Sequence, residues 1–285
     1  MKLAIMSDIH SNIVAFEACL MYIKQNPVDA VVLLGDFVSD CPDPGRTLKK
    51  IYELMDTMPV YAIRGNREEY FLRYRDGQED NWTISSYKGS LLYTYERLTK
   101  EDLDWFDRLP STLVLQLPGT EPIRLVHGSM YSSKELLDYG KENTKECLKK
   151  LDTKYMLAGH THRQMSFSYE GKTLINPGSV GVAIGTSKNA HMAYLNWENG
   201  SWNHEFFSVP FAFDEVQKWF HESSLIQMAS IWPICILKSM DVGENLGPLC
   251  AKRAYDMAVA DHALNEDGNP PEAYWESAAK ELGVI

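Results

Sequence analysis

Residues 2–12 read KLAIMSDIHSN, and this stretch introduces the pattern on which the predicted fold rests. Its apolar start predicts a buried strand, and Asp8 and His10 follow that strand directly. Residues two apart in an extended backbone face the same side, so these two side chains can hold one ion. Ser11 or Asn12 can then cap a helix, because the apolar residues that follow recur at helical spacing.

The same order of apolar strand, short polar motif and helix continues along the chain. The strand expected over residues 30–34 precedes Asp36, and the strand expected over residues 60–63 precedes Asn66. A helix is expected between them, over residues 47–58. This β-α-β-α-β order predicts parallel strands in an α/β layer. The motifs at the strand ends therefore meet at one edge of the sheet, where functional sites of such folds cluster.

The middle of the chain changes from helices to short strands. Residues 68–110 are charged and aromatic and predict helices. Strands are then expected over residues 113–117, 123–126, 155–158, 164–169, 172–175, 192–197 and 202–207, with a helix over 144–151. Turn-forming pairs such as Asn199-Gly200 separate several of these strands. The sequence predicts an α/β fold built as a two-sheet β-sandwich flanked by helices.

Seven side chains in the short motifs are of metal-binding types. They are Asp8, His10, Asp36, Asn66, His127, His160 and His162. Carboxylate, amide and imidazole donors in this mixture suit a pair of divalent transition metals. Asp36 has two carboxylate oxygens with which to bridge two ions, and His160 and His162 can each serve a different ion. Two such ions, roughly 3.5–4 Å apart, can share a nucleophilic hydroxide and clamp phosphate oxygens.

The order of the motifs, DxH, GD, GN, VHG and GHTH, resembles that of the calcineurin-like metallophosphoesterase superfamily. The later segment NPGS, residues 176–179, is similar to one in the small bacterial phosphodiesterase branch of that superfamily. The resemblance covers residues 1 to about 210. It implies the metallophosphoesterase fold and a dinuclear centre of divalent ions, with Mn foremost and Fe, Ni, Zn or Co as alternatives. It implies one ion bound by Asp8, His10 and His162, a second bound by Asn66, His127 and His160, and a bridge by Asp36.

Residue 67 departs from the pattern of the family. The box that usually reads Gly-Asn-His followed by an acid has Arg67 in place of the histidine. In monoesterases of the family that histidine protonates the leaving group, and a guanidinium cannot do so near neutral pH. Arg67 can instead hold phosphate oxygens through its fork of N–H donors, or form a salt bridge with a nearby acid at the surface. We expect His127 or Arg67 to help position the phosphate.

The residues and the resemblance together predict a metal-dependent phosphoesterase. We expect a phosphodiesterase that uses a hydroxide bound by both ions, acting on a small phosphorylated substrate, nucleotide-derived ones included. A hydrolase of dinucleoside polyphosphates is the alternative within this class. A non-catalytic scaffold is the alternative from another class, because a retromer subunit of this fold has lost its ligands and binds proteins. The seven donors retained here favour an enzyme.

The composition narrows the cellular setting. The formal net charge is −11, which disfavours stable binding to nucleic acid or to an anionic membrane. The five cysteines lack the spacing of a metal site and are typical of reduced thiols. No stretch approaches the roughly 20 apolar residues of a membrane span. We therefore expect a cytoplasmic protein.

Residues 211–285 differ in composition from the rest, with 12 acids against 5 bases. They also carry large apolar side chains, such as Trp219 and Trp232, that need burial. We expect a helical C-terminal extension that packs on a metallophosphoesterase domain, residues 1–210, or on a partner subunit of a homo-oligomer. A cover over the metal cleft is favoured over a dimer surface. The last helix is expected to begin at an Asn269 cap.

Two remaining groups of residues have structural interpretations. Packing between helices is favoured over nucleobase stacking for the aromatic residues Tyr70, Phe71, Tyr74 and Trp82. A structural role is also expected for the histidines outside the motifs, His191, His204, His221 and His262.

Overall fold

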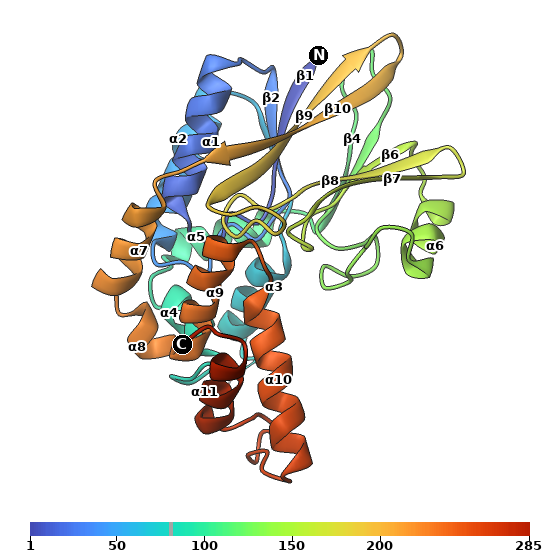
Figure 1. The fold of residues 1–285 in the computed structure, drawn as a ribbon. Coiled ribbons are helices and arrows are strands. Elements are labelled where there is room, and N and C mark those ends of the chain that lie inside the picture. Colours follow the sequence, from blue (N-terminus) through green and yellow to red (C-terminus); the bar gives the residue numbers. More distant parts are fainter. Residues whose placement is uncertain (80–81) are drawn as a thin grey trace.

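The computed structural model describes residues 1–79 and 82–285. Two five-stranded sheets lie face to face at one end of the molecule, and helices cover their outer sides and fill the other end (Figure 1). The strands are β1 (Lys2–Met6), β2 (Ala30–Leu33), β3 (Val60–Ala62), β4 (Thr112–Leu115), β5 (Ile123–Val126), β6 (Tyr155–Leu157), β7 (Gln164–Tyr169), β8 (Lys172–Pro177), β9 (Asn189–Glu198) and β10 (Ser201–Pro210).

The helices fall into three groups along the chain. The first group, α1 (Ile13–Gln25) and α2 (Pro44–Thr57), connects the first three strands. The middle group is α3 (Asn66–Arg75), α4 (Gly89–Tyr95), α5 (Lys100–Arg108) and α6 (Glu142–Lys150). The C-terminal group is α7 (Phe213–Glu222), α8 (Leu225–Ala229), α9 (Ile231–Val242), α10 (Leu246–Ala260) and α11 (Glu272–Glu281). Among the described residues, no helix combines the length and the apolar character needed to cross a membrane.

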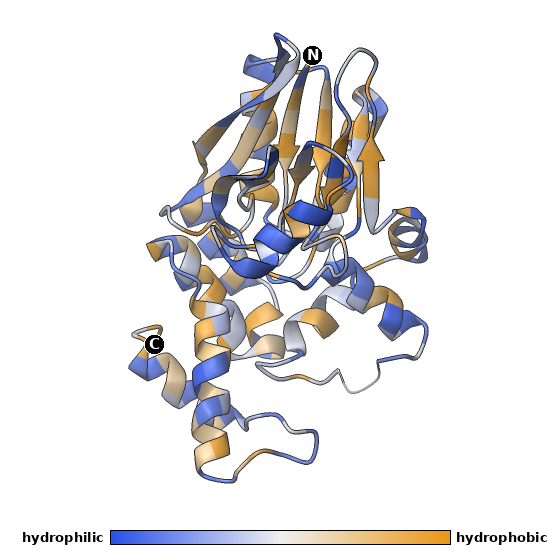
Figure 2. Cartoon of the chain, turned by 90° about the vertical axis from the view of Figure 1, so that its right-hand side faces the viewer, coloured by the Kyte–Doolittle hydropathy of each residue, from blue (hydrophilic) through white to orange (hydrophobic). Residues whose placement is uncertain are grey.

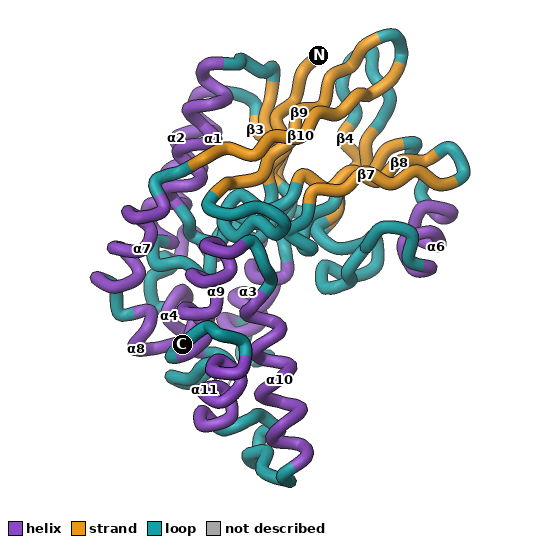
Figure 3. Tube along the Cα trace, viewed as in Figure 1, coloured by secondary structure: helices purple, strands orange, loops and turns teal. Residues whose placement is uncertain are grey.

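Both sheets are mixed: antiparallel strands lie on one side of the parallel strands in the first sheet and on both sides in the second. The first sheet has the order β10-β9-β1-β2-β3, in which β1, β2 and β3 are parallel because helices cross over between them. The second has the order β4-β5-β6-β8-β7, with β5, β6 and β8 parallel. The carboxyl ends of these parallel strands run into the loops between the sheets and the C-terminal helices (Figure 3).

The core between the two sheets is made by apolar side chains from both. Leu3 and Ile5 of β1 pack in one cluster with Leu125 of β5 and Leu157 of β6, and all four are fully buried. Apolar residues accordingly concentrate on the strands (Figure 2). The opposite face of the first sheet packs against the helices, because Phe16 of α1 and its neighbours fill that side. The predicted α/β two-sheet sandwich with flanking helices is confirmed.

Several predicted boundaries shift by a few residues. Asn12, not Ser11, caps α1, since its Oδ1 accepts a hydrogen bond from the backbone N–H of Ala15 at 3.1 Å. The helix expected from residue 47 begins at Pro44, because Asp43 caps it. Residues 80–81, inside the segment expected to be helical, lie outside the described part of the chain.

The predicted Asn269 cap of the last helix is wrong. Helix α11 begins at Glu272, and its N-cap is Pro271, which has an extended backbone. Asn269 instead lies in a loop, where its N–H donates to Oδ1 of Asn265 at 2.8 Å. The two consecutive prolines explain the shift, because a residue before proline is biased towards extended backbone.

The C-terminal extension is helical, as expected, and it packs on the core. The backbone carbonyl of Met228 in α8 accepts a hydrogen bond from the N–H of Ser85 at 3.0 Å. A side chain could not stand at Gly89 of α4, because its Cβ would lie 1.9 Å from that same carbonyl oxygen. Helices α10 and α11 project farthest from the sheets (Figure 1). The division into two domains, residues 1–210 and 211–285, stays a prediction.

Candidate metal centre

The seven predicted donors come together at the carboxyl ends of the parallel strands. Asp8 follows β1, Asp36 follows β2 and Asn66 follows β3, all in the first sheet. His127 follows β5, and the two histidines of the GHTH motif follow β6, both in the second sheet. The first four donors in the chain and His127 are buried, and His160 and His162 are partly buried. The site therefore lies where the loops of the two sheets face each other.

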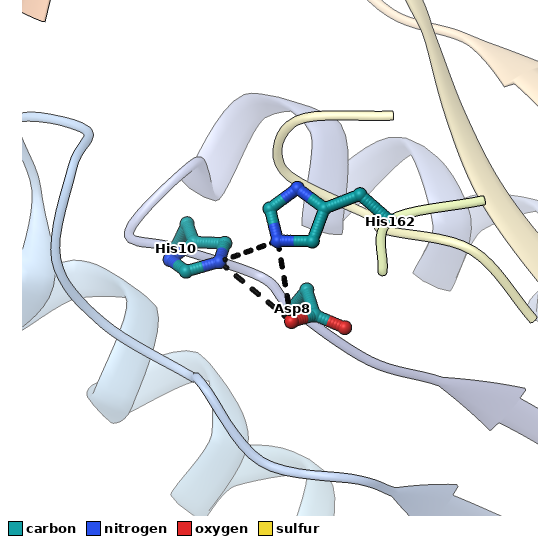
Figure 4. Close-up of side chains that lie close together, drawn as sticks. All are labelled: Asp8, His10 and His162. Atoms are coloured by element: carbon teal, nitrogen blue, oxygen red, sulfur yellow. Dashed lines mark hydrogen bonds and ion pairs between the residues drawn. The ribbon is translucent and has the colours of Figure 1, made fainter. Parts of the chain in front are cut away.

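Asp8, His10 and His162 form the first donor cluster. One ligand atom from each lies within 4.8 Å of the others. Nε2 of His162 lies 3.3 Å from Oδ1 of Asp8 and 3.1 Å from Nε2 of His10. Nε2 of His10 lies 3.7 Å from the same Asp8 oxygen. Figure 4 shows both rings turning a nitrogen towards that oxygen, so three donors share one small space.

Asp36, His127 and His160 form the second donor cluster, again with ligand atoms within 4.8 Å. Asn66 joins it, because its Oδ1 lies 3.1 Å from Nε2 of His127. Oδ2 of Asp36 lies 3.4 Å from Nε2 of His127 and 3.8 Å from Nε2 of His10. One carboxylate oxygen therefore faces both clusters, which is the position that a bridging ligand requires.

The donor chemistry fits divalent metal ions. Oδ1 of Asp8 is buried and has no hydrogen-bond donor among the described residues, although three imidazoles lie around it. Nδ1 of His127 lies 2.7 Å from the carbonyl oxygen of Leu34, and Nδ1 of His162 lies 2.9 Å from that of Val182. Nδ1–H donation to these carbonyls leaves each Nε2 lone pair directed into the cluster, as in metal-binding histidines. A buried anionic oxygen facing imidazole lone pairs is satisfied by a cation.

The electrostatics of the cluster depend on its charged neighbours. Burial opposes the ionisation of Asp8, but His162 and His127 outweigh it and hold the pKa of Asp8 well below its usual range. Burial likewise opposes protonation of His127, but Asp36 and Asp8 raise its pKa to about 10. Burial and then the charge of His127 lower the pKa of His160 to about 4. Positive charge is therefore strongly favoured between the two aspartates.

The backbone at the site is strained. Five of the seven donors have a positive φ: Asp8 (54°), His10 (49°), Asp36 (52°), His160 (67°) and His162 (59°). A residue other than glycine in this region costs about 1–3 kcal/mol and persists only where the surroundings enforce it. Hydrogen bonds enforce it here, since the N–H of His10 donates to the carbonyl of Asp36 at 3.0 Å. Strain concentrated on donor residues is typical of a functional site.

Glu68 holds the loop that carries Asp36, and the sequence analysis did not assign it this role. Its carboxylate accepts hydrogen bonds from the backbone N–H groups of Gly65 (2.7 Å), Asp36 (2.8 Å) and Phe37 (2.9 Å). Burial and the charge of Asp36 raise its pKa to about 7. The spacing of Glu68 three residues after Gly65, as in a capping box, is the signal that could have indicated the role.

Asp40 is the second residue that the sequence analysis missed. Its Oδ2 lies 3.3 Å from Nδ1 of His10 and accepts a hydrogen bond from Nη2 of Arg67 at 2.8 Å. Its Oδ1 accepts hydrogen bonds from Nε1 of Trp232 at 2.8 Å and from the hydroxyl of Ser90 at 3.1 Å. Asp40 thereby connects the first donor cluster to Arg67 and to the C-terminal extension.

Asn176 of the NPGS segment supports the GHTH loop. Its side-chain amide donates to the carbonyl of Gly159 at 2.6 Å and to the hydroxyl of Thr161 at 3.0 Å. Its Oδ1 accepts from the N–H of Gly178 at 2.9 Å. In the sequence this segment carries only a family resemblance, whereas in the structure Asn176 helps to fix the loop that carries His160 and His162.

Arg67 forms an ion pair with a nearby acid, Asp40, which was one of the two roles expected for it. The pair is largely buried, whereas a surface position was expected. Its side chain is 19% exposed, and that of its partner Asp40 is 4% exposed. Arg67 also lines a cavity of about 250 Å³ together with His10, Asp36 and His162. Its contact with a phosphate group stays a prediction.

The C-terminal helices form part of the wall of that cavity. Trp232 and Ile236 come from α9, Pro248 comes from α10, and Asn245 comes from the loop before it. The extension therefore lies beside the donor clusters. Its effect on substrate choice stays a prediction.

The aromatic residues of α3 and its neighbours serve mainly in packing, as predicted. The ring of Tyr74 stacks on that of Trp82 at 4.2 Å between centroids, and Phe71 meets Trp82 edge to face at 5.8 Å. Phe71 and Trp82 are buried. Tyr70 differs from the other three, because it lines a cavity next to the donor clusters.

The chain belongs to the calcineurin-like phosphoesterase superfamily, whose domain model matches residues 1–200. An uncharacterized protein from Methanocaldococcus jannaschii is 27% identical over an alignment of 196 residues, which covers 63% of this chain and 76% of that relative. The family implies divalent metal ions, and the two donor clusters are where this chain would hold them.

Two solved structures show the same fold. A hypothetical protein from Pyrococcus horikoshii superposes with a TM-score of 0.69 at 18% identity, covering 85% of this chain and 98% of its own. A metallophosphoesterase from Sphaerobacter thermophilus superposes with a TM-score of 0.62 at 23% identity, covering 81% of this chain and 99% of its own. The branch of the superfamily to which the chain belongs stays a prediction.

Proposed function

We propose that this protein hydrolyses phosphodiesters with a pair of divalent metal ions, Mn foremost. One observation carries the proposal: two three-residue donor clusters meet at a single oxygen of Asp36. Bound there, a pair of divalent ions would supply Lewis-acid charge and an activated water molecule. Asp8, His10 and His162 would hold one ion, Asn66, His127 and His160 the other, and Asp36 both.

The remaining chemistry depends on side chains of the chain itself. Arg67 lines the cavity and can hold phosphate oxygens through its N–H donors, while Asp40 fixes its orientation. Arg67 cannot protonate a leaving group near neutral pH. A substrate whose leaving group departs without a proton, such as a phosphodiester with an acidic leaving group or an anhydride, is therefore favoured over an alkyl monoester.

The test compares three substrates with protein loaded with Mn²⁺: bis(p-nitrophenyl) phosphate, p-nitrophenyl phosphate and a dinucleoside polyphosphate. We expect the highest kcat/KM on the diester. Faster hydrolysis of the monoester would overturn the diester preference, and faster hydrolysis of the dinucleoside polyphosphate would favour that alternative. If fully loaded protein hydrolyses none of them, the scaffold alternative replaces the enzyme. A cytoplasmic location and self-association stay predictions.

A further inference from the structure

A second cavity adjoins the donor clusters and has a different character. Its volume is about 470 Å³, and it shares Asp40, Arg67, Trp232 and Pro248 with the cavity over the clusters. The two cavities therefore lie side by side, with these four residues as a common wall. Part of its wall comes from Ala251 and Trp275, which lie beyond the residues matched by the family model.

Three cationic side chains line this second cavity: Arg67, Lys88 and Lys134. Both lysines lie over one ring, because Nζ of Lys134 is 4.4 Å and Nζ of Lys88 is 6.0 Å from the ring centroid of Tyr70. Arg67 is neutralised by Asp40. Nζ of Lys88 lies 3.9 Å from the carboxylate of Glu79, which also accepts a hydrogen bond from Arg73. Among the described residues, Lys134 forms no ion pair with a carboxylate.

This arrangement favours an anion. The net charge of the chain is −11, yet three cationic side chains and only two carboxylates, Asp40 and Glu79, line this cavity. Burial lowers the pKa of Lys88, and the charges of Lys134 and Arg67 lower it further against the opposing effect of Glu79. A phosphate group would reverse this repulsion, because each lysine can donate a charge-assisted hydrogen bond to it. Tyr87, 50% exposed, and Trp232 add ring surface to the same wall.

We propose that this cavity binds a second phosphate group of the substrate, through Lys88 and Lys134, while the scissile phosphate lies at the donor clusters. The proposal rests on the proposed function and narrows it to substrates with two phosphate groups separated by a small organic unit. The rings of Tyr87 and Trp232 provide the surface on which a flat part of that unit can pack.

A matched pair of substrates tests the proposal. Thymidine 5′-(p-nitrophenyl phosphate) is compared with the same compound carrying a 3′-phosphate, and the readout is the ratio of their kcat/KM values. We expect a ratio near 100 in favour of the 3′-phosphorylated compound, about tenfold for each lysine contact. Lys88→Gln and Lys134→Gln should each lower the ratio about tenfold, and the double variant should bring it near one. Lys218→Gln, at an exposed position on α7, is the control and should leave the ratio unchanged.

A ratio near one in the unmodified protein, or a ratio that survives in the double variant, would overturn the proposal. A binding measurement distinguishes failure of the second phosphate site from failure of the proposed phosphodiesterase activity. Thymidine 3′,5′-bisphosphate and thymidine 5′-monophosphate are titrated calorimetrically into metal-loaded protein. If neither ester is hydrolysed but the bisphosphate binds more tightly and loses that advantage in the double variant, the proposed function fails and the second phosphate site stands. Equal affinities would remove the site.

Discussion

Asp36 shows how much of the candidate centre depends on single atoms. Its Oδ2 faces both donor clusters, while its Oδ1 accepts a hydrogen bond from the backbone N–H of Arg67 at 2.8 Å. The two oxygens of one carboxylate therefore have separate tasks, one towards the ions and one towards the loop. A neutral side chain such as asparagine could keep the hydrogen bond to Arg67 but would bring no negative charge to the two ions.

Asp36→Asn should lower kcat by at least about 100-fold, because it removes the only charge that both ions would share. We expect the bound metal, measured by elemental analysis, to fall below two ions per chain, while circular dichroism keeps the spectrum of the parent. Asp56→Asn, an exposed carboxylate on α2, is the matched control. Full activity and two ions in Asp36→Asn would contradict the bridging role.

Arg67→His should raise monoester hydrolysis relative to diester hydrolysis. An imidazole can donate a proton to the leaving group near neutral pH, and a guanidinium cannot. The measurement is the ratio of kcat/KM for phenyl phosphate, whose leaving group needs a proton, to that for bis(p-nitrophenyl) phosphate, whose leaving group does not, and it should increase about tenfold. Arg108→His, exposed at the end of α5, should leave the ratio unchanged. An unchanged ratio in Arg67→His would show that residue 67 does not select the substrate.

Among the secondary-structure elements, α11 and α9 are joined to the segment before α4 by a partly buried polar contact, in addition to apolar packing. Glu272, at the start of α11, accepts hydrogen bonds from the backbone N–H of Ser86 at 2.7 Å and from its hydroxyl at 2.6 Å. That hydroxyl also accepts from the N–H of Ile231, the first residue of α9, at 3.0 Å. Two helices and the segment before α4 are thereby held at one point.

Glu272→Ala should lower the free energy of unfolding by about 2 kcal/mol, because hydrogen bonds to a charged group contribute about 1.5–3 kcal/mol and their loss leaves Ser86 unsatisfied. We expect α11 to be cleaved faster in limited proteolysis. Glu276→Ala, an exposed position on the same helix, should change the unfolding midpoint in urea by much less. Equal effects of the two substitutions would show that α11 is held by apolar packing alone.

For the whole molecule, buried histidine makes stability depend on pH. His191 on β9 is 4% exposed, and burial lowers the pKa of its imidazole to about 4. The unfolded chain binds this proton near pH 6.5, so His191 favours folding above that pH, and its contribution is lost as the pH falls from about 6.5 towards 4.

His191→Gln should therefore flatten the acid side of the stability curve. Between pH 4 and 6.5 its free energy of unfolding should change less steeply with pH, by up to about 1.4 kcal/mol for each pH unit. Urea unfolding at several pH values measures the slope. His221→Gln, exposed on α7, is the control. A parallel acid limb in His191→Gln would show that another group causes the loss of stability.

Local patterns in the sequence were sufficient for most of the fold. Apolar runs that end in Asp36 or Asn66 predicted β2 and β3, and pairs such as Asn199-Gly200 predicted the hairpin turn, where both residues have positive φ. These predictions succeeded because side-chain periodicity and turn chemistry act over a few residues. The Asn269 cap failed for a local reason as well, since the two prolines after it outweighed its capping tendency.

The sequence by itself determined the donor types, their order and the strand ends that carry them. Only the tertiary structure brings the donors of one cluster together, because His10 and His162, 152 residues apart, meet through the packing of two sheets. It also decided the roles of Asp40 and Glu68, whose importance comes from burial and from partners elsewhere in the chain. The placement of Lys88 and Lys134 was likewise decided only by the tertiary structure. Their charges face one cavity because α3, α4 and the loop after β5 converge there, and no local pattern encodes that convergence.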